Sequence, residues 1–396
     1  MIYNSCNALN YEQLEIELEL VVGTDLNTVL NGSLEVGNST INGSNLLCSI
    51  TWYLISSGTF LASGYLELLL GAIAIPTNLI LMAILPRATV LHSNTRWFLA
   101  NTALAFIILT AHCWLKSVFT LAFAKTPSRL QMAKGECLGL ETLFLIASMV
   151  THIFLVSLAA ERVSTIKQQE PTVGSAGTIG KSVCLGAWLM STLAMIIIFF
   201  TTPKLHIRLP YCNTLLVSTA TGMMLSSLFF GAMELLALGL YILVWVKSRK
   251  SLINFAVNQA QLSLQCRFQL KRNIEVTQIL LPVVIVIVLF NMVSLLTVIS
   301  IQAGPVSYLN AIIVSQYLNY VSIVILALIF PIQVILRCES LQNKVVKIFR
   351  LKRGMNALKS DSYHREGQVR MQALEDLWNK KFSQKVIPGS NEKECK

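Results

Sequence analysis

The sequence contains few charged residues. Only 13% of its 396 residues are Asp, Glu, Lys or Arg, whereas 54% are hydrophobic. Soluble globular domains carry about 25% charged residues, so this composition argues against a soluble fold. Long apolar runs stand in place of the charges, and about 20 residues at 1.5 Å each cross the hydrocarbon core of a bilayer. Backbone polar groups find no water there, so each run is expected to be a helix.

These runs predict an all-α membrane protein, a bundle of seven membrane-spanning helices. The expected spans are Ala62–Leu85, Trp97–Phe119, Leu138–Ala160, Val183–Thr202, Gly222–Val246, Ile279–Ile301 and Leu309–Leu336. The stretch Leu46–Leu61 is also rather apolar, so the first helix can begin earlier. The spans divide the chain into an N-terminal arm (1–61), a seven-transmembrane domain (62–336) and a tail (337–396).

Basic residues are absent from the first 60 positions, which carry six acids. With the N-terminus outside, 25 of the 31 Lys and Arg residues fall on the inner side of the membrane. Cytoplasmic loops carry such an excess of positive charge, so the bias predicts an extracellular N-terminus and a cytoplasmic tail. The net charge of +11 is therefore assigned to a membrane protein and not to a nucleic-acid-binding one.

Three Asn-x-Ser/Thr sequences precede the first span, at Asn31, Asn38 and Asn42. Such sequences are acceptors for N-glycosylation in extracellular segments. They lie on the side that the charge bias makes extracellular. Together with the Asn, Gly and Ser content of this segment, they predict a flexible, glycosylated arm.

Four of the nine cysteines are expected to lie on the oxidising outer side of the membrane. Cys137 falls at the outer end of the third span, and Cys212 falls in the loop before the fifth. A disulfide between them can persist there and would tie the loop to the third helix. Cys6 and Cys48 also lie outside and can pair, although the sequence does not fix that pairing.

The sequence lacks the motifs of enzymes and metal sites. It has no Gly-rich phosphate loop, no paired His or Cys spacing for a metal and no nucleophile elbow, so no enzyme, cofactor or metal is predicted. It also lacks the internal duplication typical of transporters. A ligand-gated channel of the insect chemoreceptor type would need the opposite orientation. A seven-helix channel or transporter stays the alternative to a receptor.

Ionisable residues within the spans are few, and such residues are costly in a bilayer and therefore candidates for function. Glu141 lies one helical turn from Cys137, and Lys116 ends the second span on the same side, so the two can pair or Glu141 can contact a ligand. We take as candidate ligand-binding residues Glu141, Lys116, His112 and Glu67. Each carboxylate, with Glu234, can instead be a structural group hydrogen-bonded within the bundle, and His152 is interpreted as a packed histidine.

Several motifs resemble those of the G-protein-coupled receptors, and more narrowly those of the nematode serpentine chemoreceptors of the Sra superfamily, classes a, ab, b and e. The motifs are ERVSTIKQQE (Glu161–Glu170) after the third span and LSLQCRFQLKRNIEVTQILLP (Leu262–Pro282) before the sixth. The resemblance covers roughly Ala62 to Arg350. It departs at Arg272, where these receptors usually carry an acid. It implies a receptor in the plasma membrane, in sensory cilia, that binds a small extracellular ligand and activates a heterotrimeric G protein.

The adjacent pair Glu161–Arg162 has two interpretations. It can mark only the point where a membrane helix meets water. The resemblance instead implies a coupling switch, in which Arg162 pairs with Glu161 and with Glu275 at the base of the sixth span at rest, and with a G protein in the active state. Arginine suits this role because it stays charged and offers five fixed donors.

The segment after the seventh span combines apolar and basic residues at helical spacing, with Leu341 and Val345 on the apolar face and Lys344 and Lys347 among the charges. Such a helix is expected to lie on the anionic inner leaflet, so membrane lipid is a predicted partner. Cys338 lies next to the membrane there and is a candidate for palmitoylation.

Overall fold

The computed structural model describes residues 33–36, 39–88, 91–167, 178–202, 205–206, 208–214, 220–257, 274–296 with gaps at 275, 279, 283, 291 and 294–295, and 308–348. Within these residues the chain is almost entirely helical. The main helices are α3 (Gly43–Ser56), α4 (Gly58–Ile84), α5 (Ser93–Ala122), α6 (Lys134–Lys167), α7 (Thr178–Thr201), α9 (Ala220–Val257), α11 (Tyr308–Gln316), α12 (Ser322–Arg337) and α13 (Glu339–Ile348). Short 3-10 turns occur at Leu85–Arg87 and Pro127–Arg129.

Six of the helical segments are long and apolar enough to cross a membrane, counting only the described residues. They begin and end within a few residues of six predicted spans, with some helices continuing further. Val276–Phe290 forms a shorter apolar helix inside the region where the sixth span was predicted. The prediction of an all-α membrane protein is confirmed.

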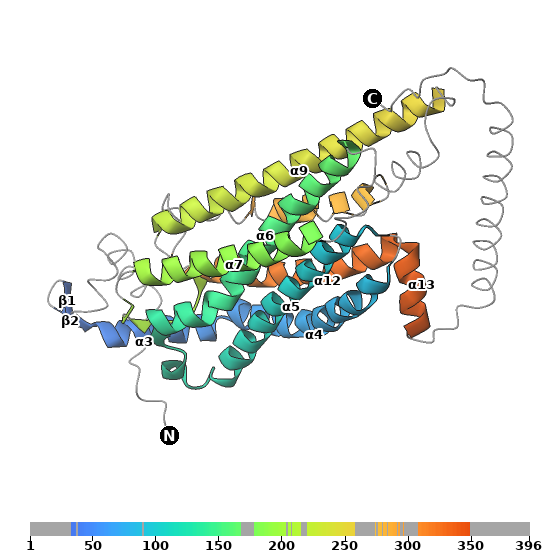
Figure 1. Cartoon of the computed structure of the whole chain (residues 1–396). Coiled ribbons are helices and arrows are strands. Elements are labelled where there is room, and N and C mark those ends of the chain that lie inside the picture. The colour runs from blue at the N-terminus through green and yellow to red at the C-terminus, as the bar shows by residue number, and fades with distance from the viewer. Residues whose placement is uncertain are drawn as a thin grey trace, which may run out of the picture.

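The helices pack as a bundle in which α4 lies against α5 and α12, and α6 lies against α5, α7 and α9 (Figure 1). Large apolar side chains also cover the outer faces, such as Leu69 on α4, Leu189 on α7 and Phe229 on α9. In water such a surface would be an aggregation hazard, but in a bilayer it contacts lipid tails. Figure 1 shows β1, β2 and α3 at one end of the bundle and α13 at the opposite end.

Polar side chains connect the helices inside the bundle. Asn78 of α4 donates from Nδ2 to the backbone oxygen of Ala327 in α12 at 2.6 Å. Trp188 of α7 donates from Nε1 to Asn101 Oδ1 of α5 at 3.3 Å. In a bundle surrounded by lipid, such bonds fix which helix faces meet, since apolar packing alone is less selective.

The predicted seventh span is helical from Tyr308 to Arg337 but contains a π-helical turn, η3, over Tyr317–Val321. A π turn inserts one extra residue into the helical repeat, and such turns often occur at functional sites. The insertion changes which residues before and after it share a face. The apolar pattern of the span does not reveal this turn.

The end of the predicted flexible arm is ordered. The strands β1 (Ser33–Val36) and β2 (Ser39–Asn42) form an antiparallel hairpin, and α3 follows it at once. Ile50 and Leu54 of α3 are almost fully buried. Thr51 of α3 donates to the backbone oxygen of Pro210 in the loop between α7 and α9 (the α7–α9 loop) at 2.9 Å. The apolar stretch before the first predicted span thus forms a separate helix that contacts this loop.

The α7–α9 loop is held to the start of α6 by a short sheet. Strands β3 (Met132–Ala133) and β4 (Arg208–Leu209) pair antiparallel, with Met132 opposite Leu209. Gly135 donates from its backbone N–H to Leu205 O at 2.8 Å, where a Cβ on the glycine would lie only 3.3 Å from that oxygen. This arrangement positions the residues that follow β4 above the interior of the bundle.

Candidate functional site

The predicted disulfide between Cys137 and Cys212 is present. It joins the first turn of α6 to the α7–α9 loop, with the two Cα atoms 5.3 Å apart. Glu141 lies one helical turn beyond Cys137 on α6, and its Oε1 is 3.8 Å from Cys212 Sγ. The bond therefore fixes the α7–α9 loop directly beside the candidate carboxylate.

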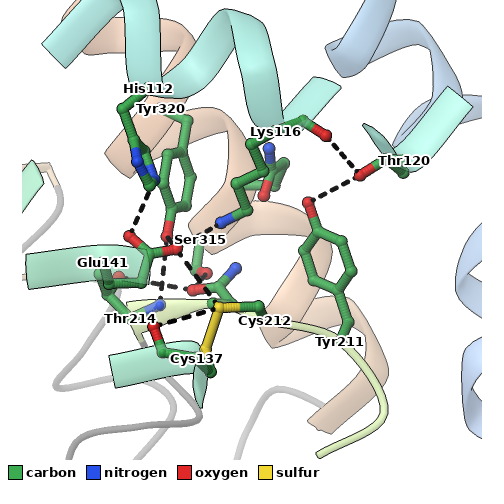
Figure 2. A network of polar contacts seen from close by, with 12 residues as sticks. His112, Lys116, Thr120, Cys137, Glu141, Tyr211, Cys212, Thr214, Ser315 and Tyr320 are labelled. Carbon is green, nitrogen blue, oxygen red and sulfur yellow. Dashed lines mark hydrogen bonds and ion pairs between the residues drawn. A yellow bond between two sulfur atoms is a disulfide. The ribbon is translucent and has the colours of Figure 1, made fainter. Parts of the chain in front are cut away.

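Glu141 accepts contacts from three side chains that come from two other elements (Figure 2). Lys116 Nζ of α5 lies 2.8 Å from Oε1, and the hydroxyl of Tyr320 in η3 donates to the same oxygen at 3.0 Å. His112 Nε2, one turn from Lys116 on α5, lies 3.3 Å from Oε2. Glu141 is 0% exposed. A carboxylate in such a place is stable only with a cation and further donors, which this cluster supplies.

The Lys116 ammonium also faces two aromatic rings. It lies 3.6 Å from the ring centroid of Tyr320 and 5.1 Å from that of Tyr211, a residue of the α7–α9 loop. Cation–π contacts of this kind contribute about 2 kcal/mol when the site is dry. Burial raises the pKa of Tyr211 well above its ordinary value, so its hydroxyl keeps its proton beside Thr120.

Glu67 belongs to a neighbouring contact set with neutral partners. Ser117 donates to Oε2 at 2.5 Å, and Gln316 donates from Nε2 to Oε1 at 2.8 Å. Ser117 follows Lys116 on α5, so the Glu67 contacts lie beside the Glu141 cluster. Of the four candidate ligand-binding residues, the structure thus brings three into one cluster and leaves Glu67 next to it.

Glu234 and His152 form a further pair between α9 and α6. His152 Nε2 lies 2.8 Å from Glu234 Oε1, its Nδ1 lies 2.7 Å from Ser148 O, and its ring packs on Phe230. The interpretation of His152 as a packed, hydrogen-bonded residue agrees with this geometry. Glu234 correspondingly has a partner within the bundle.

Glu161 and Arg162 meet near the C-terminal end of α6 and turn toward the start of α5. Arg162 Nη2 lies 3.0 Å from Glu161 Oε2 and also donates to Thr95. Glu161 Oε1 lies 3.2 Å from His92 Nδ1. The side chains of Arg162 and Glu161 are only 3% and 8% exposed. Glu275, the predicted cross-helix partner, lies outside the described residues.

The sequence did not reveal four of these contact residues. His92 and Thr95 are polar residues just before the second predicted span, and the acid–arginine pair could have prompted a search for donors there. Tyr211 precedes Cys212 in a loop, and nothing in its sequence context marks it as buried. Tyr320 faces Glu141 from a π turn that the sequence pattern does not show.

The remaining candidate residues are placed as follows. Asn31 and Asn38 lie outside the described residues, and Asn42 is the last residue of β2. Cys48 is disulfide-bonded, whereas Cys6, the partner considered for it, lies outside the described residues. Cys338 is a buried free thiol between α12 and α13, so acylation would require that junction to open.

Metal binding receives no support from the part of the chain that the structure describes. No group of three or more His, Cys, Asp or Glu side chains is close enough there to hold a metal ion. The polar clusters instead combine carboxylates with cations and hydroxyl donors. They are suited to hydrogen-bonded recognition and to exchange of ion-pair partners.

The length and apolar surface of the helices define a multi-pass membrane protein. Residues 46–364 match the serpentine type 7TM GPCR receptor class ab chemoreceptors, and because this match covers most of the chain, the chain belongs to that family. A stretch of 210 residues is 25% identical to serpentine receptor class alpha/beta-14 of Caenorhabditis elegans. The stretch covers 52% of this chain and 53% of that relative, about half of each. A seven-transmembrane receptor class has one span more than the six long helices, and Val276–Phe290 lies in the region of the predicted sixth span.

Proposed function

We propose that the chain is a chemosensory G-protein-coupled receptor of the plasma membrane. It binds a small molecule from the outer side and activates a heterotrimeric G protein on the inner side. The observation that carries this proposal is the placement of two polar clusters on one helix. α6 holds Glu141 near its outer end and the Glu161–Arg162 pair near its inner end. A displacement of α6 by a ligand is therefore transmitted to the inner cluster.

The outer cluster is the proposed ligand site because it gathers groups from four parts of the fold. The helices α5 and α6, the turn η3 and the α7–α9 loop all contribute to it. A ligand that exchanges contacts with this cluster changes how these elements are held together. An equilibrium between two such arrangements shifts by the difference in ligand affinity for them, and a few kcal/mol suffices.

The inner cluster is the proposed coupling switch, and the burial of its charged side chains supports this role over a simple membrane boundary. Residues that only mark the boundary would extend into water, yet Arg162 and Glu161 are 3% and 8% exposed. At rest, Arg162 contacts Glu161 and Thr95. In the active state its guanidinium turns to an inserted segment of the G protein, and two alternative sets of bonds form a bistable element.

The proposed orientation places residues 1–61 outside, the domain 62–336 in the membrane and the tail 337–396 in the cytosol. The inner helix α13 would then lie on the anionic leaflet, with Leu341 facing the bundle. Glycosidase treatment should increase gel mobility, and changing Asn31, Asn38 and Asn42 to Gln together should remove that change. An epitope after Lys396 that stained unpermeabilised cells would overturn the topology.

The proposed function is tested by expression in cells that report G-protein activation. A panel of small water-soluble odorants is applied, and the same cells without the receptor are the control. A receptor-dependent signal in response to a compound supports the proposal. A compound-gated current that persists when G proteins are inhibited would favour the channel alternative.

A further inference from the structure

The side chains around Glu141 form a binding site for a carboxylate. An ammonium at 2.8 Å, a phenol at 3.0 Å and an imidazole nitrogen at 3.3 Å converge on the two oxygens of Glu141. These three groups belong to Lys116, Tyr320 and His112. None of them comes from α6, the helix that carries Glu141 (Figure 2). The bundle therefore presents two donors to one carboxylate oxygen and an imidazole nitrogen within ion-pair distance of the other, and Glu141 is the group that fills this site.

Contacts that do not involve Glu141 also hold Tyr320 and Lys116 in place. The Tyr320 hydroxyl accepts a hydrogen bond from the backbone N–H of Thr214 at 3.1 Å, which leaves its own hydrogen for the carboxylate. Lys116 is confined by the rings of Tyr320 and Tyr211. Its side chain is 9% exposed, so its ammonium has little access to water. The donors are thus preorganised, so binding of a carboxylate loses little conformational entropy in ordering them.

We infer that the ligand of the proposed receptor is a small carboxylic acid whose carboxylate replaces that of Glu141 between Lys116, Tyr320 and His112. This inference rests on the proposed function and names the ligand class for its outer site. An amine is the less suitable ligand. It would find the single carboxylate of Glu141, and it would leave the Lys116 ammonium buried without its partner.

Displacement of Glu141 also explains how such a ligand acts on the receptor. In the ligand-free arrangement, Glu141 ties α6 to α5 and η3 through Lys116 and Tyr320. A free carboxylate satisfies the same donors but has no covalent link to α6. Binding therefore releases α6 at its outer end while α5 and η3 keep their contacts. The ligand thus favours a second arrangement of α6, the helix that ends in Glu161 and Arg162.

The first experiment uses the full-length receptor with Glu141→Ala, purified in detergent. The change leaves the donor set without its carboxylate. Sodium acetate and sodium propionate are compared with sodium chloride and methylammonium chloride at equal ionic strength, with the melting temperature as the readout. Binding of acetate at about 100 times its Kd should raise the melting temperature by on the order of 5 °C.

Two matched variants define the control. Glu67→Ala removes an equally buried carboxylate whose partners, Ser117 and Gln316, are neutral, so acetate should not stabilise it. Adding Lys116→Met to Glu141→Ala should abolish the effect of acetate. If Glu141→Ala does not reach the membrane, Glu141→Ser is measured in its place. The inference is wrong if acetate stabilises the Glu141 variant no more than chloride does, or if methylammonium stabilises it instead.

A second experiment tests the ligand class in cells. Straight-chain carboxylic acids of two to eight carbons are compared with the matching alcohols and amines on the wild-type receptor. Acids alone should activate it, and Lys116→Met should reduce their response at least about tenfold, the factor that corresponds to loss of one charged contact. Activation by amines or alcohols and not by acids would overturn the inference. If acetate stabilises the purified Glu141 variant but no acid gives a signal in cells, the carboxylate site is supported and the proposed G-protein coupling is refuted.

Discussion

Replacing Lys116 with methionine tests how strongly the outer cluster holds the bundle. Methionine keeps the length of the lysine stem but removes the ammonium 2.8 Å from Glu141 Oε1. The carboxylate, which is 0% exposed, would keep only the Tyr320 hydroxyl and the His112 imidazole. Breaking a buried ion pair by removing one partner costs about 3–5 kcal/mol. Because two partners of Glu141 remain, we expect a loss of stability at the lower end of this range, about 3 kcal/mol.

The expected loss translates into a measurable thermal shift. For a domain of about 150–250 residues, 1 kcal/mol corresponds to roughly 2–4 °C in Tm, so Lys116→Met should lower the Tm by roughly 6–12 °C. Glu141→Leu alone should cost a similar amount, because it leaves the Lys116 ammonium unpaired. The double variant Lys116→Met/Glu141→Leu removes both charges and should be much closer to the wild type, since apolar replacements of a whole buried pair are often neutral.

A double-mutant cycle in purified receptor measures this coupling. The four proteins are melted in the same detergent and at the same concentration, and surface expression is recorded beside the melts. We expect a coupling energy of at least about 2 kcal/mol between the two positions. Additive losses, with coupling below about 0.5 kcal/mol, would show that the pair does not act as a unit and would refute our reasoning on the outer cluster.

Two further predictions concern the covalent and steric links of the bundle. Changing Cys137 to Ser should lower the melting temperature, because closing a loop of about 75 residues contributes up to about 4.5 kcal/mol in the chain-entropy model. The bond itself is checked by mass spectrometry of a non-reduced digest. Finding Cys137 and Cys212 as free thiols would contradict it. Changing Gly180 to Ala should reduce the yield of folded receptor, because its Cβ would lie 2.9 Å from Asn94 Cα of α5. Gly186 of the same helix is the control and should tolerate alanine, because an added Cβ there would meet nothing within 4 Å.

Much of the fold follows from the sequence because the bilayer leaves few choices. An apolar run of sufficient length must form a helix, and this argument located all six of the long apolar helices. It placed some of their ends less well. Lys247 and Lys250 end the apolar run of the fifth span, yet α9 continues to Val257 because these residues suit a helix in water as well.

The sequence revealed the charged members of the site but not their partners. Glu141 and Lys116 stand out because charges are costly in lipid and must be paired. Tyr320 does not stand out in the sequence, because tyrosine is an ordinary residue in a membrane helix. The direction of its side chain depends on a π turn that the sequence does not show. Tyr211 and Thr95 are equally hidden, because their contacts bring together segments that are far apart in the chain.

The central claim is that the Arg162 cluster controls coupling to a G protein. The direct test is receptor-dependent G-protein activation by Arg162→Ala, Glu161→Gln and the wild type at equal surface density. Arg96→Ala is the control, because Arg96 is another arginine at the same end of the bundle and its side chain donates to a backbone oxygen, that of Pro86, rather than to an acid. We expect Arg162→Ala to abolish signalling, Glu161→Gln to raise basal activity and Arg96→Ala to signal normally. An Arg162→Ala receptor that signals with wild-type amplitude would contradict the claim and leave the pair as a membrane boundary.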